Sequence, residues 1–161
     1  MRFGRSDNTT WLKFEGPIRY TEAREVKSFL EREVVPQMTD TMVIDLREVD
    51  SVDSTGLGLL ATIGKCSLSR HSRRAVIVCP EGNVAQCLRA MQFDKLFTFT
   101  EALEQPREVV LQPVALQTGH EPLVSVMLGA HEELASLDDR NKARFNDVVD
   151  VLQQAVKRRR E

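Results

Sequence analysis

Two spacings of apolar residues alternate along the first hundred positions of the chain. Apolar and polar residues alternate in Trp11–Glu15, as in a strand with one covered face. Met42–Leu46 and Ala75–Cys79 are continuous apolar runs of the kind found in strands buried on both faces. Phe97–Phe99 is predicted to form a further short strand.

Segments with apolar residues three and four positions apart separate these runs. They predict helices over Ala23–Val34, Leu57–Leu68 and Val84–Met91, the first of them capped by Thr21. A last, brief helix is expected to begin at Thr100–Leu103. Strands that alternate with helices predict an α/β fold, with a small, mostly parallel sheet and right-handed crossovers.

Three other stretches have less regular patterns. Residues 1–10 are polar and are expected to lack regular structure. Ile18 and Tyr20 follow a Gly-Pro break and could add a second short strand. Pro106–Pro122 is predicted to be a linker, in which Val109–Leu111 could pair as an edge strand.

The helical period returns at Leu123 and continues for more than four heptads, interrupted by the polar Asn141. The pattern fits one long helix or a hairpin broken near Ser136–Asp139, with Asp138 capping the second helix. The stripe either folds back onto the preceding domain or forms a partner-binding helix. In the second case it could hold a homodimer together, with Asn141 as a register-setting position.

The length of 161 residues fits one domain with an appendage. We divide the chain into a domain at 1–106, a linker at 107–122 and a C-terminal helical extension at 123–161. A formal net charge of −2 gives no polyelectrolyte character, which argues against a nucleic-acid partner. The chain contains no apolar run of membrane-spanning length and begins without an apolar signal core, so we expect a cytoplasmic protein with no membrane contact.

The junction between the Met42–Leu46 strand and the following helix is the candidate site. Asp53, Ser54 and Thr55 are all residues that cap helices well, so the helix is expected to begin here. Two hydroxyl groups then lie at the positive end of a helix dipole. Gly56 and Gly58 leave the nearby backbone approachable.

The stretch Asp53-Ser54-Thr55-Gly56-Leu57-Gly58, after a strand ending in Ile44-Asp45-Leu46, resembles the D-S-[ST]-G-L-G motif of STAS domains (sulphate transporter and anti-sigma factor antagonist). The resemblance covers about Thr10 to Glu104 and is nearest to stand-alone bacterial anti-sigma factor antagonists. It implies a small mixed sheet with helices mainly on one face. The chain departs from the family at Gly16-Pro17-Ile18-Arg19, where many relatives have G-[ED]-[LI]-D, so Arg19 replaces an acidic residue of the usual partner surface.

The resemblance implies a phosphorylation-controlled binding switch in transcription regulation. Ser54 corresponds to the phosphorylation site, and Thr55 is a possible secondary acceptor. The unphosphorylated form would bind an anti-sigma factor that is also a serine kinase of the histidine-kinase-like ATPase class. Phosphorylation would release it, and a PP2C-type serine phosphatase would reset the switch. The implied partner-binding residues are Asp53, Ser54, Thr55, Gly56, Leu57 and Gly58; the nucleotide belongs to the kinase, so this chain needs no cofactor.

The physical effect of such a phosphate is a changed surface rather than unfolding. A phosphate adds about −1.5 to −2 charges, which the helix N-terminus tolerates in the free domain. A loss of only about 2.7 kcal/mol in binding free energy lowers the affinity for a partner about 100-fold. The alternative is that Ser54 and Thr55 only cap the helix, and that the chain is a scaffold or assembly module of a signalling or transport complex.

An enzyme is not expected. His71, His120 and His131 lie in a predicted loop, linker and helix, with no recognisable relation to Ser54. The chain has no G-x-S-x-G, P-loop, G-x-G-x-x-G or H-E-x-x-H motif and no Cys/His metal spacing.

Two further sets of polar residues are expected to have structural roles. The cysteines, Cys66, Cys79 and Cys87, are odd in number and without C-x-x-C spacing, which favours reduced thiols. Asp45, at the end of its strand, is expected to make local hydrogen bonds.

Overall fold

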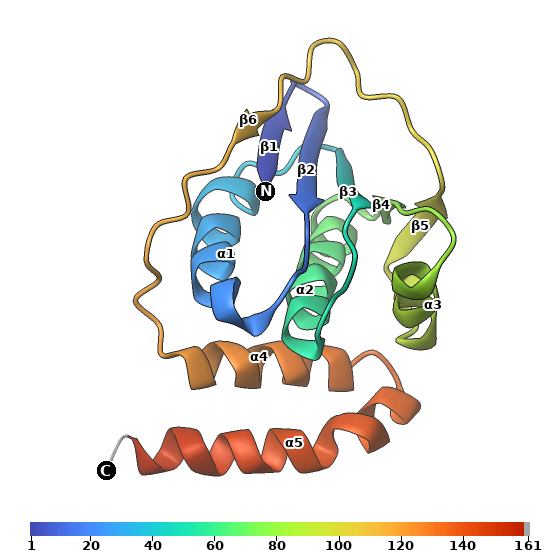
Figure 1. Cartoon of the computed structure of the whole chain (residues 1–161). Coiled ribbons are helices and arrows are strands. Elements are labelled where there is room, and N and C mark those ends of the chain that lie inside the picture. Colours follow the sequence, from blue (N-terminus) through green and yellow to red (C-terminus); the bar gives the residue numbers. More distant parts are fainter. Residues whose placement is uncertain (160–161) are drawn as a thin grey trace.

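The computed structural model describes residues 1–159, which form one six-stranded sheet with helices packed on it and a helical hairpin below (Figure 1). The strands are β1 (Arg2–Arg5), β2 (Thr9–Glu15), β3 (Thr41–Glu48), β4 (Ala75–Val78), β5 (Phe97–Thr100) and β6 (Gln112–Pro113). The helices are α1 (Ala23–Phe29), α2 (Ser54–His71), α3 (Asn83–Ala90), α4 (Leu123–Ala135) and α5 (Asp139–Arg158). A π-helical turn (Leu30–Val34) extends α1, and 3-10 turns lie at Tyr20–Glu22 and Phe93–Lys95.

The sheet has the order β5-β4-β3-β2-β1-β6 and confirms the predicted α/β class. Strands β2, β3, β4 and β5 are parallel neighbours, as strand–helix–strand crossovers require. Strand β1 runs antiparallel to both β2 and β6, so the sheet is mixed but mostly parallel.

The two faces of the sheet are covered differently. On one face, Leu12, Ile44 and Ile77 pack with residues of α1, α2 and α3 in the main core. Alternate residues of the same strands, Trp11 and Val43, face the other way into a small second cluster. The helices of residues 1–106 therefore pack on one face, as the resemblance implies.

The segment between β5 and α4 runs along the domain rather than away from it. Val109 is buried in the second cluster, beside Trp11, and covers the face that has no helices. This segment does supply an edge strand, β6, which pairs with β1. The strand begins just after Val109–Leu111, the residues predicted to form it. Near its end, Glu121 forms an ion pair with Lys27 of α1.

The C-terminal stripe forms a helical hairpin that docks on its own chain. Helix α4 packs against α2 and α1, and α5 packs against the outer side of α4 (Figure 1). Asp138 caps α5 by accepting a 2.8 Å hydrogen bond from the amide of Asn141. The side chain of Asn141 is buried and donates to the carbonyl of Met91, so this polar position fixes the hairpin within the chain.

Four local predictions were wrong. Residues 2–5 form β1, because pairing with β2 and β6 orders this strand while outward side chains such as Arg2 stay in solvent. Ile18 makes only an isolated bridge with Val52, and Tyr20 lies in a 3-10 turn. The N-cap residue of α1 is Glu22, and the predicted cap, Thr21, lies in the middle of the preceding 3-10 turn. Thr100–Leu103 do not begin a helix, because the carbonyl of Thr100 accepts from the amide of Cys79 and so continues the sheet.

Candidate functional site

The candidate site begins where α2 begins, and Asp53 organises it. One carboxylate oxygen of Asp53 accepts the amide of Gly56 at 2.8 Å, which caps α2. The other accepts the amide of Tyr20 at 2.7 Å, which ties the 3-10 turn to the helix start. Both oxygens of Asp53 are thus engaged, and Ser54 is the first residue inside the helix.

The hydroxyl of Ser54 is hydrogen-bonded to a histidine of the C-terminal hairpin. Ser54 Oγ lies 2.9 Å from His131 Nε2, and His131 Nδ1 lies 2.7 Å from the carbonyl oxygen of Met127. A carbonyl only accepts, so Nδ1 carries the proton of the neutral ring. Nε2 therefore accepts the hydrogen bond, and Ser54 donates it.

Helix α4 holds His131 firmly in this place. The histidine is only 4% exposed, and its ring packs edge-on against Phe145 of α5, with centroids 5.7 Å apart. The helix backbones approach closely at Gly58: a Cβ atom there would lie 2.5 Å from the carbonyl carbon of Ala130. Only glycine permits this approach, so the small residue of the motif seats α4 on α2.

The six residues that the sequence singles out are not equally accessible. Asp53 and Ser54 are partly exposed, whereas the four that follow, Thr55, Gly56, Leu57 and Gly58, are buried. A Cβ atom at Gly56 would lie 2.7 Å from the side chain of Ile18, so this glycine also serves packing within the chain. The expected exposed hydroxyl is instead a partly buried one that α4 contacts.

An open cleft of about 600 Å³ lies beside Ser54, between the start of α2 and the hairpin. Its lining is mostly apolar, and Val151 of α5, 65% exposed, lies at its solvent side. The ionisable side chains in the lining are Tyr20, Asp53, His131 and Asp147. Among the described residues that line the cleft, none is a lysine or arginine.

His131 is the site residue that the sequence analysis missed. It is 77 positions from Ser54, and the contact depends on how the hairpin docks. The helical period that begins at Leu123 predicts an apolar face, but an isolated histidine on such a face has no recognisable partner in the sequence. Arg19, the departure from the family pattern, is exposed and immediately precedes the 3-10 turn.

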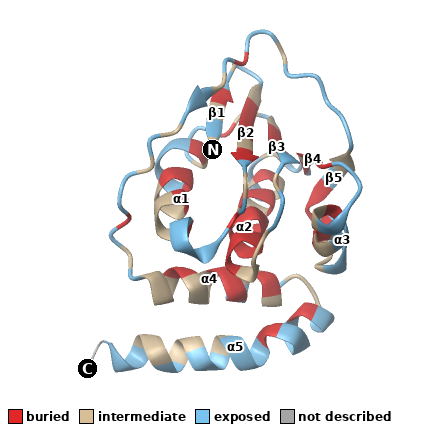
Figure 2. Cartoon of the chain, viewed as in Figure 1, coloured by how far each residue is buried: buried red, intermediate tan, exposed pale blue. Residues whose placement is uncertain are grey.

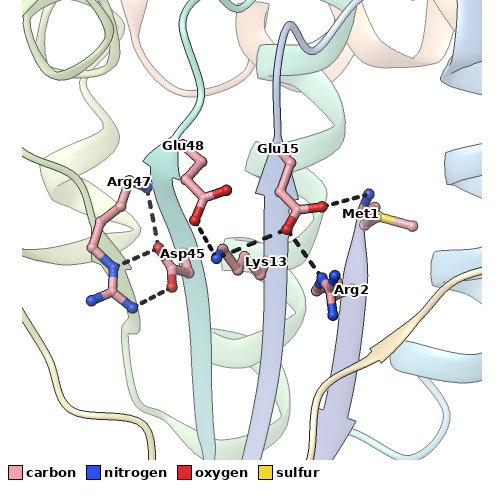
Figure 3. A network of polar contacts seen from close by, with 7 residues as sticks. All are labelled: Met1, Arg2, Lys13, Glu15, Asp45, Arg47 and Glu48. Atoms are coloured by element: carbon pink, nitrogen blue, oxygen red, sulfur yellow. Dashed lines mark hydrogen bonds and ion pairs between the residues drawn. The ribbon is translucent and has the colours of Figure 1, made fainter.

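Asp45 has the local role expected of it, in a network of polar contacts on the sheet (Figure 3). It alternates with Ile44 of the main core and so lies on the face away from Ser54. Its carboxylate accepts two hydrogen bonds from the Arg47 guanidinium, at 3.0 and 2.6 Å, and one from the Arg47 amide. Burial alone raises the pKa of Asp45, but these bonds and the charges of Arg47 and Lys13 outweigh it and hold the pKa below its usual range. The neighbouring Lys13 pairs with Glu48 and Glu15.

The described residues hold no cluster of three or more histidine, cysteine, aspartate or glutamate side chains able to bind a metal ion. Cys66, Cys79 and Cys87 are all free, and burial raises the pKa of the Cys66 and Cys79 thiols, which makes them poor nucleophiles. Within residues 1–159, no helix has both the length and the apolar character needed to cross a bilayer.

Comparison with known proteins identifies the larger part of the chain. A family model of the STAS domain matches residues 3–105. The NMR structure of the protein TM1081 is similar with a TM-score of 0.52 at 21% identity, over 61% of this chain and 78% of that one. The structure of the anti-sigma factor antagonist SpoIIAA in its unphosphorylated form gives a TM-score of 0.52 at 11% identity, over 62% of this chain and 88% of that one. At these identities the two structures support the fold.

Proposed function

The chain belongs to the STAS domain family, and on that premise we propose that it is a bacterial anti-sigma factor antagonist, a non-catalytic binding switch controlled by phosphorylation of Ser54. In its unphosphorylated form it binds an anti-sigma factor that is also a serine kinase of the histidine-kinase-like ATPase class. Phosphate on Ser54 releases this partner, and a PP2C-type phosphatase restores binding. The protein acts in the cytoplasm on the regulation of transcription.

The observation that carries the proposal is the position of Ser54. It is the first residue of α2, partly exposed beside an open cleft, within a six-residue motif typical of the family. Amide groups of a first helical turn favour anionic oxygens, so a phosphate here is compatible with the fold of the domain. Asp53 is engaged in capping and keeps the backbone around Ser54 in place.

The electrostatics of the site support release of a partner by phosphorylation. Asp53 and Asp147 already line the cleft beside Ser54, and a phosphate would add about −1.5 to −2 charges. A partner surface that packs against the neutral hydroxyl would then face a concentrated negative charge. The homodimer considered from the sequence is not part of the proposal, because α4 buries Val126 and Leu134 within its own chain.

The second candidate is a scaffold or assembly module without a phosphorylation switch. The hydrogen bond between Ser54 and His131 favours it, because it gives the hydroxyl a structural partner inside the chain. On this alternative, Ser54 would help to seat the hairpin and would carry no phosphate.

Affinity capture from the native host with three matched variants separates these functions. Immobilised Ser54→Ala is expected to retain the kinase partner, and Ser54→Asp is expected to lose it. Ser69→Asp, an exposed serine near the other end of α2, controls for the added charge and should retain it. Equal retention of the same partner by Ser54→Ala and Ser54→Asp would reject the switch and favour the scaffold.

A further inference from the structure

Helix α4 of the C-terminal hairpin lies across the start of α2 (Figure 1). Its His131 is hydrogen-bonded to Ser54, the residue that the proposed function makes the switch. We propose that docking of the α4–α5 hairpin and phosphorylation of Ser54 exclude one another, so that the hairpin is an intramolecular cover of the switch site. The phosphorylation step rests on the proposed function. The contacts of the hairpin with Ser54 and Gly58 are observed in the structure and do not depend on that function.

The docked hairpin hinders the transfer reaction itself. Transfer requires Ser54 Oγ to attack the γ-phosphorus of a nucleoside triphosphate, while the bond to the diphosphate leaving group breaks and a kinase base takes the hydroxyl proton. In the docked state this hydroxyl donates to the buried His131, and Gly58 lies directly beneath the backbone of Ala130. A kinase that must surround Ser54 therefore competes with α4 for the same part of α2.

The product of the reaction is also incompatible with the docked hairpin. A phosphate on Ser54 would enter a mostly apolar cleft whose carboxylates are Asp53 and Asp147. None of the described residues that line the cleft is a lysine or arginine that would pair with the phosphate. When the hairpin leaves, Asp147 and the apolar residues of α5 leave with it, and the phosphate lies in water at the start of α2, where the helix dipole favours it.

The coupling works in both directions. If phosphate disfavours docking, docking disfavours phosphorylation by the same factor, because the two are linked equilibria. Without phosphate the docked state dominates, since Val126 and Leu134 of α4 and Phe145 of α5 are buried in the main core. The exposed outer face of α5 (Figure 2) adds no burial, so the hairpin is held chiefly through α4.

Thiol labelling at position 54 of the full chain measures the cover directly. Ser54→Cys is prepared alone and combined with Gly58→Ala or Gly129→Ala, and labelling by iodoacetamide is resolved by mass spectrometry from Cys66, Cys79 and Cys87. Gly58→Ala inserts a methyl group against the Ala130 backbone, whereas a Cβ atom at Gly129 meets nothing within 4 Å. Both substitutions favour their own helix equally, so Gly129→Ala is a matched control.

The cover predicts slow labelling at position 54 in the Ser54→Cys chain and with Gly129→Ala. Gly58→Ala should accelerate it at least about tenfold, a shift of about 1.4 kcal/mol in the opening equilibrium. Leu134→Asp, which disrupts docking from the hairpin side, should do the same while the buried Trp11 keeps its native fluorescence. Because Leu134 lies on α4, this second variant still tests the proposal if Gly58→Ala distorts α2 itself.

Equal rates in all backgrounds would overturn the cover, as would labelling in the Ser54→Cys chain as fast as that of Ser69→Cys, an exposed position on α2. Labelling does not depend on a kinase. Failure of the cover therefore appears as equal rates, whereas failure of the proposed function appears as a partner that binds Ser54→Ala and Ser54→Asp alike.

Discussion

The hydrogen bond between Ser54 and His131 predicts a measurable coupling between the switch residue and the hairpin. His131→Ala removes this bond, worth about 0.5–1.5 kcal/mol net, and the edge-on contact with Phe145, worth about 0.5–1.5 kcal/mol. It also leaves a cavity, because the histidine is buried. We expect a total loss of about 2–4 kcal/mol in the free energy of unfolding.

Ser54→Ala loses the same bond but little packing, so it should cost about 1 kcal/mol. The double variant should cost less than the sum of the two, with a coupling of about 0.5–1.5 kcal/mol. Urea unfolding measures these energies through the fluorescence of the single tryptophan, the fully buried Trp11, with far-UV circular dichroism as the second probe.

Ser54→Ala combined with Asp45→Asn is the control pair, because Asp45 lies on the other face of the sheet. These two effects should add within about 0.3–0.5 kcal/mol. A Ser54–His131 coupling no larger than that of the control pair would show that the two side chains do not interact, and that the hairpin does not engage Ser54.

Three further outcomes are expected. Asp45→Asn should cost about 1–3 kcal/mol at pH 7. The lowered pKa of Asp45 means that this stability is present above the ordinary carboxyl pKa of about 3.9 and is lost as pH falls through the lower folded-state pKa. Urea titrations should therefore show that the difference in unfolding free energy between the unsubstituted protein and Asp45→Asn becomes smaller in acid. Gly64→Ala should lower the thermal midpoint despite its better helix propensity, because a Cβ atom there lies 2.6 Å from the ring of the buried Phe97; an unchanged or higher midpoint would show that the ring can move. Ser54→Glu should speed hydrogen exchange in α4 relative to Ser54→Ala, and equal exchange would show that negative charge at Ser54 does not loosen the hairpin.

The sheet and the start of α2 could be predicted because their causes are local. The apolar run Met42–Leu46 fits a strand buried on both faces, and Asp53 has the side chain that caps the next helix. Strand β1 could not be predicted in this way. Two of its four residues are arginines, and it is held in a strand conformation by pairing with β2 and β6.

The contact at the heart of the site could not be predicted because it is tertiary. The sequence indicates that α4 has an apolar face, but not that this face lies on α2 or that His131 then meets Ser54. The motif glycines show the same limit, since Gly58 is equally suited to a partner's backbone and to the chain's own helix. The structure assigns that space to Ala130.

The proposed switch requires a regulatory phosphate on Ser54. Site-mapped mass spectrometry of the full chain, purified from its native host across growth and stress conditions, tests it most directly. A switch at Ser54 predicts a singly phosphorylated species with the phosphate on Ser54, in a fraction that changes with conditions. An unmodified Ser54 in every condition, or phosphate found only at other residues, would contradict it.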